Sequence, residues 1–176
     1  MRRTTTSWAT VVACLSIAAA VACRGGNSPA TVTPTGVPSA AITTATPMPT
    51  PPTEAQISAA YLAYWDAYAT ALLNLDPSLA QGVATGEELE RIKQEIADLR
   101  GKGVALRVTV THDFAVVKSS VDGATVVDRY VDRSFYVDPS TKEPQNAEVA
   151  GKTITDNFEF TRVDGRWIVI RSRRLN

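Results

Sequence analysis

The sequence has few of the residues that build metal and redox sites, with one histidine and two cysteines in 176 residues. Structural zinc and iron–sulfur sites usually need four Cys or His ligands, so we predict no metal site. Eighteen basic and 18 acidic residues leave no net charge, which argues against a nucleic-acid partner because such proteins usually carry a basic excess. The motifs GxGxxG, GxSxG, CxxC and HExxH and the P-loop are all missing. The sequence therefore predicts no cofactor.

Acidic residues are missing from the first 53 positions, and the first is Glu54. Arg2 and Arg3 precede an uncharged run from Trp8 to Ala22, a pattern typical of a secretory signal peptide. The run has about 15 residues, whereas a permanent membrane-spanning helix needs about 20. We predict a signal peptide over residues 1–22, and the alternative is a short membrane-anchor helix.

The segment Ala-Val-Ala-Cys at positions 20–23 resembles the lipobox of bacterial lipoproteins. The resemblance implies that Cys23 is lipidated and becomes the first residue of the mature chain. Ala20 occupies the position where the usual pattern has Leu, Val or Ile. The segment Val-Val-Ala-Cys at positions 11–14 also matches the lipobox. Cleavage before Cys14 would, however, leave a shorter apolar run in the signal peptide. The expected location is a cell membrane, with the protein lipid-anchored and facing outside the cytoplasm, because two or more acyl chains hold a protein there stably.

Aromatic residues are missing from positions 24–53, and Arg24 is the only charge there. The segment consists mostly of Thr, Pro, Ala, Ser and Gly, and it cannot bury enough apolar surface to offset the entropy of ordering. We predict that residues 23–53 are the lipidated cysteine and a disordered tether with polyproline character. Residues 54–176 hold all 18 acidic residues against 15 basic ones, and this length corresponds to one folded domain.

Two helices are predicted at the start of this domain. Thr53 and Gln56 form a capping-box pattern, which favours a helix start at 54. Helix-spaced apolar residues follow, and Pro77 marks the stop. They are Ile57, Tyr61, Tyr64, Trp65, Tyr68 and Leu72. A second capping box at Thr85–Glu88 precedes the next helix, which ends at the glycines 101 and 103.

From position 104 the apolar residues repeat every second position, which indicates strands. We predict four strands, at 104–116, 124–138, 153–163 and 167–172, with a bend near 111–114 in the first. Tight turns at 121–124 and 164–165 join neighbouring strands as hairpins. The fold class is therefore α+β, with N-terminal helices packed on a strongly curved four-stranded antiparallel sheet.

The aromatic segment at 61–65 (YLAYW), the element order and the ending at 162–169 (RVDGRWIV) resemble the nuclear transport factor 2-like superfamily. These domains are also described as cystatin-like cones or SnoaL-like domains. The resemblance implies a cone with an internal cavity, and we expect Trp167 in its core. The superfamily includes isomerases, dehydratases, cyclases and non-catalytic binding modules. We expect a non-catalytic module that binds a small apolar ligand or an envelope protein, with a homodimer implied by analogy. The alternative is a small isomerase or cyclase.

Catalysis would centre on His112, which the alternation places on the apolar side of the first strand. The resemblance implies a general base at such a position, with Asp128 or Asp132 as its orienting partner if the strand register allows it. The two aspartates lie about 13 Å apart along a strand, too far to share a proton or one metal. In the alternative reading they share a solvated outer face with Tyr130, Ser134 and Tyr136, balanced by Asp–Arg pairs.

Aromatic side chains are the candidates for lining a ligand pocket, because their polar tips suit such sites. The alternative is that the helical ones are simply core. The pocket candidates are Tyr61, Tyr64, Trp65, Tyr68, Tyr130 and His112.

Overall fold

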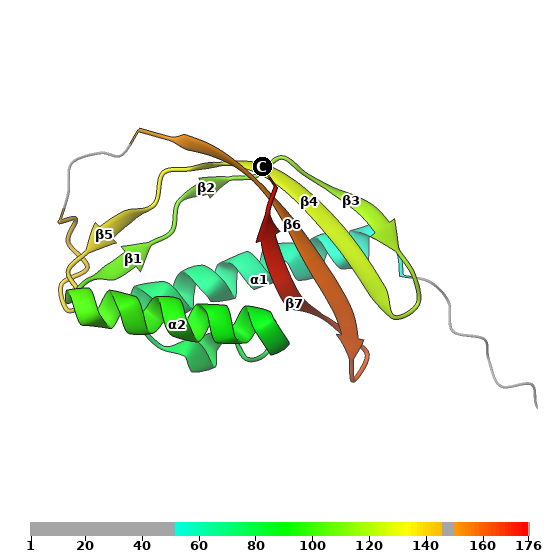
Figure 1. Cartoon of the computed structure of the whole chain (residues 1–176), viewed down its shortest axis with the longest axis horizontal. Helices are drawn as coiled ribbons and strands as arrows, with labels where there is room; N and C mark the ends of the chain where they lie inside the picture. The colour runs from blue at the N-terminus through cyan, green and yellow to red at the C-terminus, as the bar shows by residue number, and fades with distance from the viewer. Residues whose placement is uncertain (1–51, 146–149, 176) are drawn as a thin grey trace, which may run out of the picture. The chain divides into compact units, whose positions relative to one another are not determined.

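The computed structural model describes residues 52–145 and 150–175 (Figure 1). The predicted signal peptide, Cys23 and nearly all of the tether lie outside these residues and stay predictions. Within the described part of the chain, no helix is long and apolar enough to cross a membrane.

Helix α1, Glu54–Asn74, starts as the sequence predicts. The Thr53 hydroxyl accepts the Gln56 N–H, and the Gln56 side chain accepts the Thr53 N–H. This reciprocal capping box satisfies two of the backbone donors that a helix start leaves unpaired. The helix ends at Leu75, whose φ of 56° breaks the helical geometry, and the short 3₁₀ helix η1, Pro77–Ala80, follows.

Helix α2, Gly86–Lys102, begins after Thr85, but the predicted capping box is wrong. The Thr85 side chain makes no cap bond. Glu88, the other half of the expected box, is 1% exposed and bonds to side chains of other elements. Burial on the inner face of the helix therefore outweighs the local cap. Gly103, with a φ of 70°, ends the helix in the left-handed conformation that glycine adopts easily.

The main sheet is antiparallel and has five strands (Figure 1). Its long central strands are β4, Gly123–Asp132, and β6, Lys152–Val163, and β7, Arg166–Arg174, pairs with the far side of β6. Strands β2, Val110–Thr111, and β3, Phe114–Ser119, pair one after the other with the near side of β4. The sheet curves over α1 without closing on itself.

A separate two-stranded sheet joins β1, Ala105–Arg107, to β5, Phe135–Val137. The predicted strands at 104–116 and 124–138 are therefore each broken, so the number of strands exceeds the predicted four. The break between β2 and β3 confirms the bend expected near 111–114. Breaking the strands lets their ends turn away from the main sheet, so that β1 packs on α1 and β5 pairs with β1.

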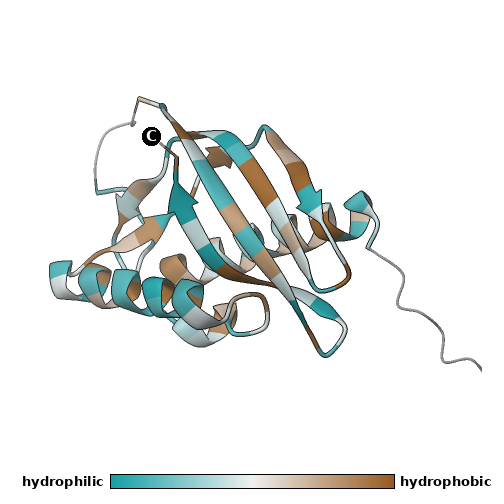
Figure 2. Ribbon diagram, turned by 45° about the vertical axis from the view of Figure 1, so that its right-hand side comes forward, coloured by the Kyte–Doolittle hydropathy of each residue, from teal (hydrophilic) through white to brown (hydrophobic). Residues whose placement is uncertain are grey.

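The inner face of the sheet packs on α1, and hydropathy alternates along the long strands (Figure 2). Asp128 and Tyr130 belong to this inner face, with exposed fractions of 0% and 5%, while Arg129 between them is exposed. The solvated-face reading of these β4 residues is therefore wrong. Trp167 also differs from the expectation, because it is only half-buried at the edge of the core.

Candidate functional site

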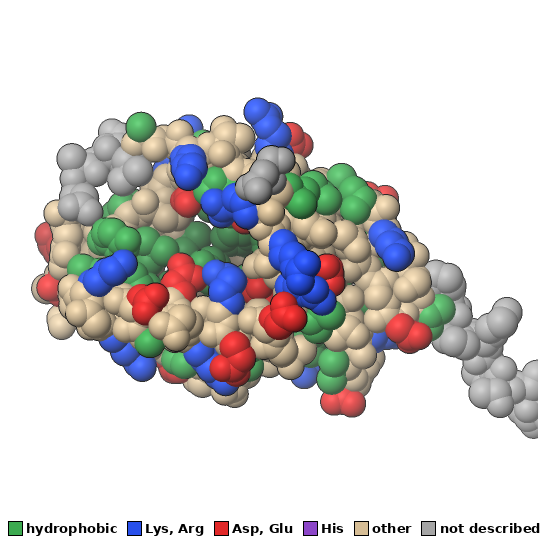
Figure 3. Space-filling model, in the orientation of Figure 1, with side chains coloured by type: hydrophobic (Ala, Val, Ile, Leu, Met, Phe, Trp, Pro, Cys, Tyr) green, Lys and Arg blue, Asp and Glu red, His purple; other side chains and the backbone are tan. Residues whose placement is uncertain are grey.

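A cavity of about 300 Å³ lies between α1, α2 and the inner face of the sheet. We call it the central cavity. Figure 3 shows it as a hollow with a hydrophobic floor and with acidic and basic side chains around its edge. Its aromatic wall consists of Tyr64, Trp65, Tyr68, Tyr130 and Phe158. Each of these side chains is at most 8% exposed, so the wall is tightly packed and its shape is fixed.

Hydrogen bonds from tyrosines to carboxylates hold three parts of this wall in place. The Tyr64 hydroxyl donates to Glu88, and the Tyr68 hydroxyl donates to Glu95 at 2.9 Å, so both bonds join α1 to α2. The Tyr130 hydroxyl on β4 donates to Asp156 on β6 at 2.6 Å. Bonds to ionised acceptors are stronger than neutral ones, and buried networks of this kind rigidify a site when every member is satisfied.

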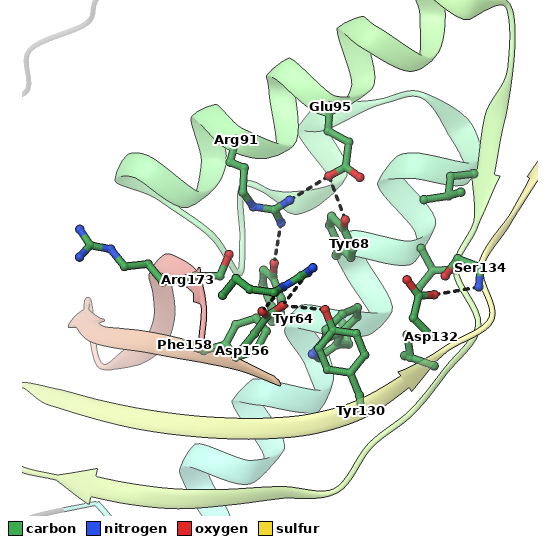
Figure 4. A pocket seen from close by; sticks show the side chains of 16 residues that line it. Tyr64, Tyr68, Arg91, Glu95, Tyr130, Asp132, Ser134, Asp156, Phe158 and Arg173 are labelled. Carbon is green, nitrogen blue, oxygen red and sulfur yellow. Dashed lines mark hydrogen bonds and ion pairs between the residues drawn. The ribbon is translucent and has the colours of Figure 1, made fainter. Parts of the chain in front are cut away.

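Arg91 and Arg174 complete the polar part of the cavity, and Figure 4 shows Arg91 beside Glu95 and Tyr64. The Arg91 guanidinium bonds Glu88 at 2.6 Å and Glu95 at 2.9 Å, and it lies over the Tyr68 ring at 5.2 Å from the ring centre. Arg174 Nε donates to Asp156 at 2.8 Å. Each guanidinium is therefore already neutralised by protein carboxylates.

The environment shifts the pKa values of these groups in opposite directions. Burial raises the pKa of the Tyr64, Tyr68 and Tyr130 hydroxyls, and the neighbouring carboxylates raise it further. Burial alone would raise the pKa of Glu88, but bonds from Arg91, Tyr64 and Ser172 outweigh it and the pKa is lowered. Glu88 is therefore an ionised, fully bonded carboxylate at neutral pH.

A second polar cluster lies between α1 and the break in the sheet edge. His112 Nδ1 is 2.6 Å from Asp128 Oδ2, and the Tyr61 hydroxyl donates to the same oxygen at 2.6 Å. Asp128 Oδ1 accepts the Asp113 N–H at 2.9 Å. Burial opposes ionisation of Asp128, but the bonds from His112, Tyr61 and the Asp113 backbone prevail and lower its pKa.

The structure divides the predicted site residues into two groups. Tyr64, Trp65, Tyr68, Tyr130 and Asp132 line the central cavity. Tyr61, His112 and Asp128 form the second cluster and do not line that cavity. The Trp65 ring, 4.9 Å from the His112 ring between centres, belongs to both places. Cys23 lies outside the described residues.

The sequence interpretation missed Glu88, Arg91, Glu95, Asp156 and Arg174 as parts of the site. Two of them carried a usable signal. Glu88 precedes Ile92 and Ile96 at four-residue intervals, which places it on the buried face of α2. Asp156 alternates with Ile154 and Phe158 on the buried face of β6. A carboxylate on an apolar face needs a partner, and each of these two faces a tyrosine.

Within residues 52–145 and 150–175, no three His, Cys, Asp or Glu side chains gather in a way that would hold a metal ion. Most polar side chains of the cavity are instead bonded to one another.

Comparison with known proteins informs the fold only. No protein-family model matches the sequence, and no curated protein matches it. The intermembrane space region of the chloroplast protein ARC6 is 15% identical with a TM-score of 0.57, covering 70% of this chain and 97% of that one.

Two further solved structures have lower scores. An NTF2-like protein from Cytophaga hutchinsonii is 17% identical with a TM-score of 0.44, covering 66% of this chain and 95% of that one. A protein of unknown function with a cystatin-like fold from Nostoc punctiforme is 10% identical with a TM-score of 0.44, covering 66% and 88%. The predicted α+β class, with two helices packed on a curved antiparallel sheet, is confirmed.

Proposed function

We propose that this chain is an exported lipoprotein, anchored to a cell membrane through lipid on Cys23, whose folded domain binds a small molecule in the central cavity. One observation carries the binding part of the proposal. The cavity walls come from α1, α2, β4 and β6, and bonds between tyrosines and carboxylates fix these elements to one another. A preformed concave site with a few fixed polar groups is the usual form of a small-molecule site.

The arrangement supports binding rather than catalysis. A general base must reach the proton that it removes, and His112, the candidate base, does not line the cavity. Glu95 and Asp156 line it, but each already bonds a tyrosine and an arginine. Engaged carboxylates of this kind support the cavity wall better than they transfer protons. Asp132 also lines the cavity and, among the described residues, accepts only the Ser134 N–H, but no histidine lines the cavity beside it.

The charged edge of the cavity favours a polar ligand over the apolar ligand that the family resemblance implies. Glu95, Asp132 and Asp156 and the arginines 91 and 174 all contribute to the lining. A purely apolar molecule would strip water from these groups without replacing its hydrogen bonds. Binding of an envelope protein and formation of a homodimer stay predictions, because the structure describes one chain.

The second candidate is a small acid–base enzyme, and the bond between His112 and Asp128 favours it. A carboxylate on one ring nitrogen leaves the other nitrogen to exchange a proton. If the molecule recovered with the protein is converted by it, and the conversion is lost in His112→Gln, the enzyme replaces the binding module as the function.

The binding proposal is tested by native mass spectrometry of the lipoprotein extracted from its own membrane. We expect a bound small molecule on the wild type. Val108→Phe and Ser134→Phe each place a ring in the cavity lining and should remove the extra mass. Val163→Phe makes the same change as Val108→Phe at an exposed hairpin position and should keep it. Absence of any bound molecule, or its retention in both blocking variants, would reject the central cavity as the site.

The anchoring proposal has a matched pair of variants in the two cysteines, Cys14 and Cys23. Cys23→Ser should move the protein from the membrane fraction to the soluble fraction outside the cytoplasm. Cys14→Ser should leave it in the membrane fraction, because Cys14 would leave with the signal peptide. The reverse result would assign lipidation to Cys14, and membrane association of both variants would reject a lipid anchor at either cysteine.

A further inference from the structure

The charges around the central cavity do not balance. Four carboxylates stand beside it, those of Glu88, Glu95, Asp132 and Asp156, and only the Arg91 and Arg174 guanidiniums bond to them. Asp132 forms no ion pair within the described residues, although Lys152 occupies the position directly opposite it on β6. Its Oδ1 accepts the Ser134 N–H at 2.8 Å. Arg173 also borders the cavity, but Figure 4 shows its guanidinium directed away from the bonded cluster. The cavity therefore has an excess of negative charge.

The hydrogen bonds around the cavity also favour a positively charged ligand that donates hydrogen bonds. The hydroxyls of Tyr64, Tyr68 and Tyr130 donate hydrogen bonds to carboxylates, and the Ser172 hydroxyl donates one to Glu88. The Tyr64 oxygen in turn accepts from Arg91 Nη2 at 3.2 Å, so the hydroxyl oxygens of Tyr68 and Tyr130 are the ones that still offer lone pairs as acceptors. The Trp65 Nε1 donor has no partner among the described residues, but the nitrogen is buried and does not reach the cavity surface. The groups left for a ligand are thus mainly acceptors.

Arg174 is the exception, because its guanidinium keeps N–H groups that Asp156 does not use. Its side chain is 51% exposed, so water screens it and supplies its remaining bonds. Asp132 is itself partly buried, so water screens its charge less than it screens the more exposed Arg174 guanidinium.

The aromatic wall also suits a cation. The Arg91 guanidinium already lies over the Tyr68 ring at 5.2 Å, in the geometry by which ring faces attract positive charge. The volume of about 300 Å³ is about ten times the share of one water in the liquid, roughly 30 Å³. A ligand of about ten non-hydrogen atoms would therefore fill the cavity.

We infer that the central cavity binds a small organic cation with N–H donors, such as a primary amine or a guanidine, with Asp132 as its counter-charge. This inference rests on the proposed binding function and adds the chemical class of the ligand. The ammonium would donate to Asp132 and to the free lone pairs of the Tyr68 and Tyr130 hydroxyls. Its carbon skeleton would lie along the aliphatic side chains of Leu106, Val108 and Val110.

The test compares three probes with one skeleton, benzylamine, benzyl alcohol and benzoate, by calorimetric titration of the full chain in detergent at neutral pH. We expect benzylamine to bind about tenfold more tightly than benzyl alcohol. Asp132→Asn keeps the acceptor for the Ser134 N–H but removes the charge. It should weaken benzylamine roughly fivefold, the effect of an ion pair of about 1 kcal/mol, and leave benzyl alcohol unchanged. Asp164→Asn, in the exposed β6–β7 hairpin, is the matched control and should change neither affinity.

The outcomes separate this inference from the function on which it rests. If benzoate or benzyl alcohol binds as tightly as benzylamine, and Val108→Phe abolishes that binding, the cavity is a binding site but not a cation site. If Asp132→Asn leaves benzylamine affinity unchanged, Asp132 is not the counter-charge and the inference fails. If none of the probes binds and no molecule accompanies the native protein, both proposals fail.

Discussion

His112 Nδ1 lies 2.6 Å from Asp128 Oδ2, although sixteen residues separate them in the chain. Asp128 is fully buried, and its lowered pKa keeps it ionised. A carboxylate can only accept, so Nδ1 of His112 carries a proton in this arrangement. With Tyr61 and the Asp113 N–H, three donors from α1 and the sheet edge meet on one carboxylate. This carboxylate joins the first helix to the break between β2 and β3.

Asp128→Asn should lower the free energy of unfolding by about 3 kcal/mol. The amide has one accepting oxygen and brings an NH₂ group toward the other donors, so at least one buried donor loses its acceptor. Urea unfolding monitored by circular dichroism measures the change. Asp113→Asn, at the exposed neighbouring position, is the control and should stay within about 0.5 kcal/mol. A loss below about 1 kcal/mol for Asp128→Asn would mean that this cluster does not stabilise the fold.

Glu88→Gln and Glu87→Gln change adjacent residues, but we expect a large loss of stability for the first and almost none for the second. Glu88 is 1% exposed and accepts bonds from Tyr64, Arg91 and Ser172, so its variant should lose about 2–4 kcal/mol by leaving Arg91 without its main counter-charge. The Glu87 side chain is 69% exposed, with Arg171 at 3.4 Å, and its loss should cost below about 0.5 kcal/mol. Parallel thermal and urea denaturation of the two proteins would show the difference, and equal stability would contradict the buried network.

The pH dependence of stability follows from the lowered pKa values of Asp128 and Glu88. A carboxyl with a lowered pKa in the folded state stabilises the fold above its unfolded pKa, which is about 4. This stabilisation disappears as the pH falls through the lower folded value. We therefore expect nearly constant stability from about pH 7 to 5 and a steep loss below about pH 4.

Urea unfolding at a series of pH values measures this profile, and Asp128→Asn supplies the comparison. The variant should show a shallower decline below about pH 4, because one of the two carboxyls has been removed. Parallel profiles for variant and wild type would show that Asp128 does not contribute to acid sensitivity.

Trp65 and Trp167 should respond differently to truncation, contrary to the expectation that Trp167 belongs to the core. Trp65 is 8% exposed and contacts five other aromatic rings and His112, so Trp65→Ala should cost about 3–5 kcal/mol. Trp167 is half-buried at the edge of the core, and Trp167→Ala should cost about 1–2 kcal/mol, because part of its surface stays in water. The order of the two denaturation midpoints decides the question, and equal losses would place Trp167 in the core after all.

The helix α1 could be predicted almost residue by residue. Its capping box at Thr53 and Gln56 and its stop before Pro77 depend on side chains within four residues of the helix ends. The α2 cap failed for the opposite reason. Glu88 has a local partner available at Thr85, but it turns inward to Tyr64, which comes from another helix.

The candidate site was less predictable than the helices. The sequence suggested the aromatic residues of α1 and left open whether His112 meets an aspartate. That meeting requires the register of β3 on β4, in which Phe114 lies opposite Asp128. A shift of one residue would turn Asp128 to the other face of the sheet, and the alternating pattern of β4 is too polar to exclude it.

Export and anchoring, the start and end of α1, the hairpin positions and the α+β class can be predicted from the amino-acid sequence, because each depends on neighbours along the chain or on composition. The folded structure is needed to see that Asp128 and Tyr130 face inward and that His112 does not line the cavity. It is also needed to see that Glu88 and Asp156 accept hydrogen bonds from tyrosine hydroxyls. These features arise where residues far apart in sequence meet. A buried carboxylate takes whichever donors the packing brings within reach, and the local sequence does not specify them.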